Sequence, residues 1–205
     1  MAKSFSDAEK KQIREALLDA GKQMFSRFGL KKTTVDELTD AVGIAKGSFY
    51  NFFESKETLY YEIFLREEKK LRGKSLMLLS STALSPESFK RFLVQTMQSI
   101  ESNPIIRWMY LTDEYQALTR KLPQEYLDAH TSGDIAALIP LIRKWQAAGQ
   151  MQSADPEIIT SVIRSLFMLV LHKKEIGEEY YDETIELLAE SIAQRLFAGK
   201  DDTDD

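Results

Sequence analysis

The stretch over residues 33–59 constrains the fold most, because it carries the signals of two short helices joined by a sharp turn. Thr34 and Glu37 have the S/T-x-x-E spacing in which the hydroxyl caps a helix and the carboxylate reaches back to the cap. Gly43 lies where the chain must turn, at a position that favours positive φ and therefore a residue without Cβ. The sequence thus predicts a helix that starts directly after Thr34, a turn at Gly43 and a second helix over residues 45–53.

The second helix presents a small polar surface opposite its apolar side. At 100° per residue, Ala45, Phe49 and Phe53 share one face, which we expect to point inward. The opposite face can donate hydrogen bonds to phosphates or base edges, as a helix in a major groove requires, and its glycine permits close backbone approach. Its residues are Lys46, Gly47, Ser48, Tyr50 and Asn51. An ordinary helix corner with a solvated polar face would show the same bare pattern.

The full string is more specific than this bare pattern. TTVDEL, followed by GIAKGSFYNFFESKETL, resembles the DNA-binding domain of the TetR/AcrR family of bacterial transcriptional regulators. The resemblance covers the first quarter of the chain, and the remainder only by its pattern of helices. It implies that Thr33 or Thr34 and Tyr50 hold phosphates, that residues 46–51 read or approach bases, and that Lys56 holds the DNA backbone.

Charge is distributed unevenly along the chain. The net charge is −5, but residues 1–56 carry 10 Lys+Arg against 8 Asp+Glu, a balance of +2, and the remainder carries −7. A weakly basic N-terminal part on an acidic body would turn its basic side toward DNA. The margin is small, so this observation supports the DNA-binding interpretation without deciding it.

Composition excludes several classes of protein. Cysteine is absent, which rules out disulfides and thiolate metal sites, and two separate histidines do not suggest a metal centre. The longest apolar run, residues 166–171, is far shorter than the ~18 residues of a membrane span. The chain lacks a phosphate-binding glycine loop and the G-x-S-x-G and HExxH motifs of hydrolases. We therefore expect a cytoplasmic, non-enzymatic protein without cofactor, metal or membrane partner.

Helix signals continue along the rest of the chain. Ser6 and Glu9 form a second capping box, and Gly29 is expected to end the first helix. Four of the five prolines mark helix starts, whereas Pro140 implies a kink or a helix that begins near Ile139. We predict an all-α fold of about nine or ten helices. Its parts are a three-helix DNA-binding domain (residues 1–55), a ligand-binding and dimerisation domain (56–200) and a disordered acidic tail (201–205).

The last two predicted helices, over residues 156–176 and 180–198, suggest a dimer. Residues 158–171 are apolar on nearly all sides in their second half, which implies burial against a partner, while the stripe on the final helix fits an ordinary core equally well. The family resemblance implies that these helices pair between two subunits as a four-helix bundle, so that the operator is a near-palindrome. Candidate interface residues are Val162, Leu166, Val170, Ile185, Leu188, Ile192 and Leu196.

The predicted helix over residues 104–119 carries apolar and aromatic side chains around its whole circumference. With aromatic residues of later helices, these form either a small-molecule pocket or a well-packed core. The family resemblance implies a ligand pocket in this region. The candidate lining residues are Trp108, Leu111, Tyr115, Trp145, Phe167 and Met168.

The sequence therefore predicts a ligand-responsive transcriptional regulator. We expect a repressor that binds a palindromic operator in double-stranded DNA as a homodimer and is released by a small apolar or amphipathic effector. The alternative is an all-helical carrier of small molecules, or a protein-interaction module, without specific DNA binding. Salt-dependent retention of DNA separates these hypotheses, because only a DNA-binding protein releases counterions from phosphates.

Overall fold

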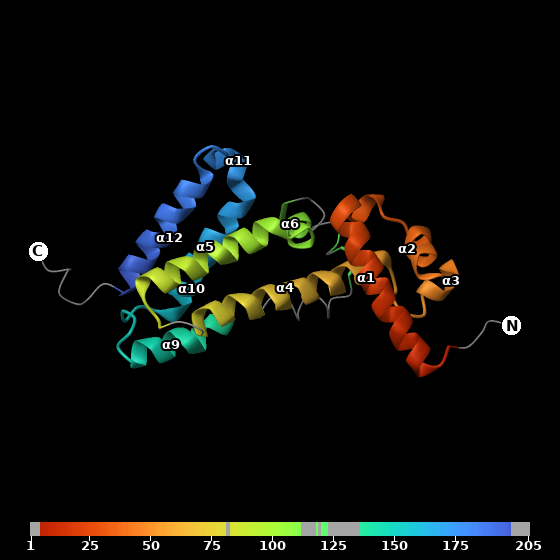
Figure 1. Cartoon of the computed structure of the whole chain (residues 1–205), viewed down its shortest axis with the longest axis horizontal. Coiled ribbons are helices and arrows are strands. Elements are labelled where there is room, and N and C mark those ends of the chain that lie inside the picture. Colours follow the sequence, from red (N-terminus) through yellow and green to blue (C-terminus); the bar gives the residue numbers. More distant parts are fainter. Residues whose placement is uncertain (1–4, 81–82, 112–117, 119, 123–135, 198–205) are drawn as a thin grey trace, which may run out of the picture. The chain divides into compact units, whose positions relative to one another are not determined.

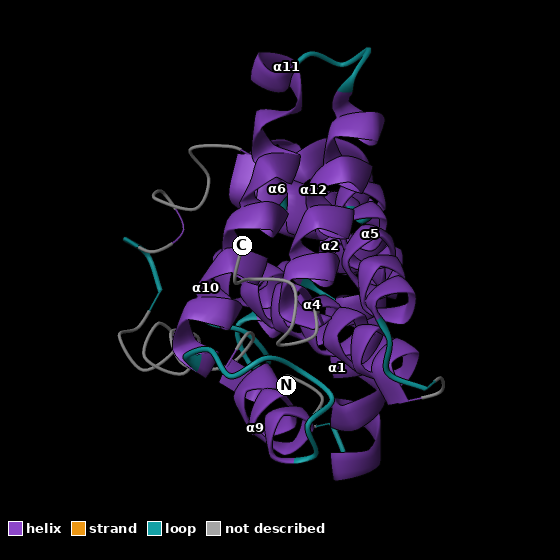
Figure 2. Ribbon diagram, turned by 90° about the vertical axis from the view of Figure 1, so that its left-hand side faces the viewer, coloured by secondary structure: helices purple, strands orange, loops and turns teal. Residues whose placement is uncertain are grey.

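The structure is a computed structural model that describes residues 5–80, 83–111, 118, 120–122 and 136–197. Every regular element within these ranges is a helix (Figure 1), and the ribbon in Figure 2 contains helices and loops alone over them. This confirms the predicted all-α fold. Residues 123–135 and the predicted acidic tail (201–205) lie outside the described residues. No described helix is long and apolar enough to cross a membrane.

The helices form two compact units. Unit 1 comprises residues 1–69 and 103–124, and unit 2 comprises residues 70–102 and 125–205. The long helix α4 (Lys56–Ser80) contributes its first part to unit 1 and its second part to unit 2. Unit 1 is therefore larger than the predicted DNA-binding domain, and the functional boundary at residue 55 stays a prediction.

Unit 1 is built from the N-terminal helices, the start of α4 and one later helix. Besides α4 these are α1 (Asp7–Lys32), α2 (Val35–Val42), α3 (Lys46–Phe49) and α6 (Pro104–Leu111). Ser6 begins α1 with the predicted capping box, in which its hydroxyl accepts from the Glu9 N–H. The predicted end of the first helix at Gly29 is confirmed as a break in α1, beyond which a further helical stretch runs to Lys32. Gly29 itself is non-helical (φ 75°, ψ 170°), and the Trp108 ring lies 3.3 Å from where its Cβ would be.

The core of unit 1 joins α6 and α4 to the N-terminal helices. The ring of Tyr60 meets Phe25 edge to face at 5.1 Å, and its hydroxyl donates to the Ile105 carbonyl at 3.0 Å. Both aromatic side chains are fully buried. The hydrogen bond to Ile105 therefore offsets the free-energy cost of burying the Tyr60 hydroxyl. The same core holds Leu17, Leu38, Phe49, Phe53 and Leu59.

Helix α1 crosses α4 at a glycine. A Cβ on Gly21 would lie 2.8 Å from Ile63 Cδ1 and 3.2 Å from Leu59 Cδ2, and Gly21 is buried. Glycine in a helix interior is unfavourable by about 1 kcal/mol relative to alanine, so its presence here reflects the close approach of the two helices. Gly73, on the exposed side of α4, has nothing within 4 Å of the corresponding position.

Unit 2 is a helical bundle around a separate core. With the second part of α4, it contains α5 (Pro86–Ser102), η1 (Ala136–Leu138), α9 (Ile139–Ala147), α10 (Pro156–Met168), η2 (Leu169–His172), α11 (Lys173–Ile176) and α12 (Tyr181–Phe197). Helix α9 begins at Ile139 with Pro140 in its first turn, as predicted. The single helix predicted over residues 156–176 is wrong, because the chain tightens to a 3₁₀ segment at η2, a common form at helix ends.

The crossing at Gly21 yields a prediction for stability. Gly21→Val should lower the free energy of unfolding by about 1–3 kcal/mol, because its methyl groups would overpack the contact with Ile63 and Leu59. Gly73→Val places the same side chain in open space and should change that free energy by less than about 0.5 kcal/mol. Thermal unfolding of both variants checks the pair. Equal stability of the two would show that the crossing is not tight.

Candidate nucleic-acid interface

Helix α2 is fixed at both ends by local interactions. The Glu37 N–H donates to the Thr34 hydroxyl at 3.2 Å, and the Glu37 carboxylate accepts from the Thr34 N–H at 2.8 Å. The hydrogen bond from the Thr34 backbone N–H, followed by that from its hydroxyl to the same carboxylate, holds the pKa of Glu37 below its usual value. Gly43 has a left-handed conformation (φ 73°), and its N–H donates to the carbonyls of the last turn. The predicted helix start and glycine turn are both confirmed.

Helix α3 is shorter than predicted. It spans Lys46–Phe49 and passes into turns up to Phe52, instead of continuing to Phe53. Phe49 and Phe53 are buried and their ring centroids lie 5.9 Å apart, which anchors both ends of this segment in the core. Ala45 does not share that inward face, because it is the exposed N-cap residue of α3 and precedes the helical turn.

Four of the predicted DNA-contacting residues form an exposed surface around α3, which we call the recognition surface. They are Lys46, Gly47, Tyr50 and Asn51. Tyr50 is 56% exposed, and its ring packs edge to face on Phe49 at 5.5 Å, so a hydroxyl is presented on a supported ring. A Cβ on Gly47 would meet nothing within 4 Å, so packing within the chain does not demand glycine there. Ser48 is half-buried beside them.

Lys46 is held by a residue that the sequence analysis missed. Its ammonium lies 2.7 Å from the Asp36 carboxylate, and both side chains are more than half exposed. The hydrogen bond to Asp36 raises the pKa of Lys46. Because exposed ion pairs are weak, a phosphate can replace Asp36 at little cost. The ten-residue separation crosses the Gly43 turn, so no helical spacing indicated this pair.

Lys56 and Thr33 make contacts within unit 1 that sequence reasoning did not predict. The Lys56 ammonium donates to the carbonyls of Leu30 and Thr33, each at 2.8 Å. Thr33 is buried and its hydroxyl donates to the Gly29 carbonyl at 2.9 Å. An ammonium has three N–H donors, so these bonds leave one for a phosphate. Lys56 thereby joins the start of α4 to the end of α1.

The residues predicted to form a dimer interface fall into two groups. Leu166, Val170 and Ile185 are buried in the core of unit 2, and Ile192 and Leu196 are partly buried against it. Val162 and Leu188 are exposed at 41% and 38%. Sequence analysis missed two more exposed apolar side chains on the same helices, Ile158 at 63% and Leu187 at 67%. Helical periodicity marks apolar positions but does not say which of them the subunit itself buries.

The residues predicted to line a ligand pocket do not all belong to one unit. Trp145 lies in the core of unit 2, Phe167 is partly buried against it, and Met168 of the same unit is 40% exposed. Trp108 belongs to unit 1, where its ring covers Gly29. The side chain of Leu111 and the whole of Tyr115 lie outside the described residues. Within the described ranges, no group of three His, Cys, Asp or Glu residues could hold a metal ion.

Comparisons with known proteins bear on the same region. The family model described as "Bacterial regulatory proteins, tetR family" matches residues 17–63, which include α2, the glycine turn and α3. The transcriptional repressor KstR2 of Mycolicibacterium smegmatis is 27% identical over 188 residues, covering 90% of this chain and 87% of its own.

Two solved structures share the fold over almost the whole chain. A TetR-family transcriptional regulator of Pectobacterium atrosepticum has a TM-score of 0.74 at 19% identity, covering 95% of this chain and 99% of its own. FadR of Bacillus subtilis, solved in complex with stearoyl-CoA, has a TM-score of 0.62 at 16% identity, covering 90% and 98%. With the signature in α2 and α3, the sequence relatives and this fold, the chain belongs to the TetR family of bacterial transcriptional regulators.

Proposed function

We propose that this protein is a dimeric repressor that binds a palindromic operator through the recognition surface and releases it when a small molecule binds. The observation that carries the proposal is the exposed set of Lys46, Gly47, Tyr50 and Asn51 on a segment that Phe49 and Phe53 anchor in the core. Small polar side chains around a glycine on a rigid helix suit the major groove. No catalytic role is assigned to any residue.

The proposed phosphate contacts flank this surface. Thr34 is exposed at the start of α2, where backbone N–H groups and the helix dipole favour an anion. Tyr50 offers its hydroxyl. Lys46 offers its positive charge, because its ion pair with Asp36 is exposed to solvent and therefore weak. Lys56 has one donor left beyond its two bonds to α1, so we assign it a phosphate contact and a structural role together.

A homodimer is supported by the apolar side chains that α10 and α12 expose. Ile158 and Leu187 are each about two-thirds exposed, at 63% and 67%, and Val162 and Leu188 add to this apolar area. Burying them against a second copy removes apolar surface from water at about 25 cal/mol per Å². Two copies related by a two-fold axis present two recognition surfaces to successive major grooves, so the operator is a near-palindrome.

The proposed effector is apolar or amphipathic and acts on the C-terminal domain. The relative FadR was solved with stearoyl-CoA, an amphipathic molecule. In unit 2, the buried hydroxyl of Tyr181 has no hydrogen-bond partner among the described residues, and burial raises its pKa to about 12. It therefore stays protonated and can donate to a polar atom of a ligand.

Release of DNA requires that effector binding and DNA binding be coupled. A hundredfold loss of DNA affinity requires about 2.7 kcal/mol of coupling free energy. We expect the protein in the cytoplasm, because the proposed function requires contact with DNA.

The alternative function is a helical carrier or interaction module that does not recognise DNA. The exposed recognition surface favours the regulator. Packing within the chain does not require a glycine at position 47, whereas close approach of DNA does, and a carrier would have no such requirement. Selection of DNA fragments on the purified protein, followed by a salt titration, separates the two hypotheses. A regulator retains a palindromic sequence, and log K falls linearly with log salt. A carrier retains no sequence above background.

Gly47 gives the most specific test of the recognition surface. Gly47→Leu should lower operator affinity at least about a hundredfold, because the side chain fills the space that a base edge or phosphate must occupy. Helicity and dimerisation should be unchanged, since the position has no neighbour within 4 Å. Gly73→Leu is the matched control, with the same open surroundings on α4. Fluorescence anisotropy on the selected duplex measures both, and wild-type affinity of Gly47→Leu would remove α3 from the interface.

Leu188 tests the dimer. Because Leu188 is 38% exposed in the isolated chain, Leu188→Glu should leave each subunit folded. In a dimer interface, the unpaired carboxylate should weaken association by about 3 kcal/mol or more. Phe28→Glu serves as the control, because Phe28 is also an exposed apolar residue but belongs to unit 1. Sedimentation velocity should give monomers for the first variant and dimers for the second; a dimeric Leu188→Glu protein would exclude this interface.

A further inference from the structure

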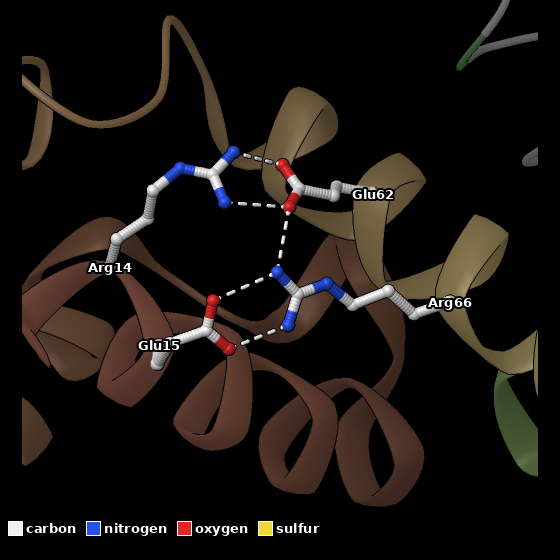
Figure 3. Close-up of polar contacts among 4 residues, drawn as sticks. All are labelled: Arg14, Glu15, Glu62 and Arg66. Atoms are coloured by element: carbon white, nitrogen blue, oxygen red, sulfur yellow. Dashed lines mark hydrogen bonds and ion pairs between the residues drawn. The ribbon is translucent and has the colours of Figure 1, made fainter. Parts of the chain in front are cut away.

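Four side chains of alternating charge connect α1 to α4 within unit 1 (Figure 3). The Arg14 guanidinium donates two hydrogen bonds to the Glu62 carboxylate, from Nη1 to Oε1 at 2.7 Å and from Nη2 to Oε2. Arg66 donates to both oxygens of Glu15, at 2.7 and 3.0 Å, and to Glu62 at 3.2 Å. We call Arg14, Glu15, Glu62 and Arg66 the α1–α4 ion-pair network.

The geometry of this network fixes the orientation of its side chains, although its ion pairs contribute little to stability. Side chains in it are 22–49% exposed, so each pair alone contributes little to stability. Both arginines bind a carboxylate through two parallel N–H groups, however, and such bidentate pairs fix the plane of the guanidinium. The hydrogen bonds from Arg66 also lower the pKa of Glu15, so that carboxylate remains charged at neutral pH.

Arg14 extends the network to the segment that carries the recognition surface. Its guanidinium carbon lies 4.9 Å from the centroid of the Phe53 ring, on whose face it packs. Phe53 is buried and contacts Phe49, the buried residue of α3. A continuous series of contacts therefore runs from Glu62 on α4, through Arg14 on α1, to the two rings that support the recognition surface.

We propose that Arg14 is a positioning residue for DNA binding, held by Glu62 against Phe53 so that α3 keeps the orientation that fits the operator. This inference rests on the proposed function. It differs from a phosphate contact by Arg14, in which the guanidinium would leave Glu62 to bind DNA. The two roles predict opposite effects for loss of the Glu62 charge.

Glu62→Gln distinguishes these roles. Removing a negative charge near the interface strengthens DNA binding by long-range electrostatics, and would also release Arg14 for a phosphate. If Arg14 acts by position, the glutamine offers one acceptor oxygen in place of two and loses the charge, so the parallel pair of hydrogen bonds is lost and the guanidinium moves off Phe53. Operator affinity should then fall about tenfold, within the usual range of coupling between sites. The slope of log K against log salt should stay unchanged, because no phosphate contact is lost.

Asp36→Asn is the matched control. Like Glu62, Asp36 is a carboxylate of unit 1 that is paired with a basic side chain. Its partner, Lys46, belongs to the recognition surface. Freeing Lys46 should raise operator affinity, whereas Glu62→Gln should lower it. A rise in both variants would mean that charge alone governs binding and would overturn the proposal.

A second variant guards against a folding defect. Arg14→Lys keeps the positive charge but loses the bidentate pair and the flat group on Phe53. It should lower operator affinity severalfold at an unchanged salt slope, with circular dichroism and the melting temperature confirming that the protein is folded. Wild-type affinity of Arg14→Lys, or affinity of Glu62→Gln equal to or above wild type, overturns the proposal. If the wild-type protein itself retains no duplex, the proposed function fails and this inference fails with it.

Discussion

The four-residue helix α3 depends on the burial of Phe49 and Phe53, because a helix of this length has almost no stability of its own. These two rings lie on either side of the exposed Tyr50 and Asn51, so the core fixes the segment that faces outward. The glycine turn sets how the chain enters α3, and the capping box sets where α2 begins. The rest of unit 1 therefore supplies the rigidity that so short an element lacks.

The lysines and arginines of unit 1 differ in how they are held, and the difference separates their roles. Lys46 is paired with one exposed carboxylate, which a phosphate can replace. Lys56 donates to the main-chain carbonyls of Leu30 in α1 and of Thr33 directly after it, so it ties the start of α4 to the end of that helix. Arg14 is bound on one side by Glu62 and on its face by Phe53. Of these three residues, Lys46 is held by the contact most easily replaced, whereas Lys56 and Arg14 each connect two segments of unit 1.

Local features of the fold could be predicted from the sequence, and tertiary ones could not. The capping boxes at Ser6 and Thr34, the turn at Gly43 and the start of α9 at Ile139 each depend on residues a few positions apart. The short helical stretch after the break at Gly29 was not predicted, nor was the packing of Trp108, from a distant helix, over that glycine. Likewise Arg14 and Glu62 are 48 positions apart, and no helical spacing relates them.

Burial explains the partial success at the predicted sites. The apolar stripe of α12 was found from its period, but the subunit buries Ile185 in its own core and leaves Leu187 and Leu188 exposed. Similarly, the period of α3 predicted an inward Ala45, because the sequence does not reveal that the helix lasts only one turn. Periodicity specifies which residues share a face, whereas packing decides which face meets solvent.

Hydroxyl-radical footprinting of the protein on its selected duplex tests the central claim most directly. A dimer with two recognition surfaces should protect two half-sites about 34 Å, or one helical turn, apart, related by the two-fold symmetry of the sequence. Protection should disappear from both half-sites as salt is raised, since both depend on phosphate contacts. A single protected half-site, or uniform protection without symmetry, would contradict a dimeric helix-turn-helix regulator.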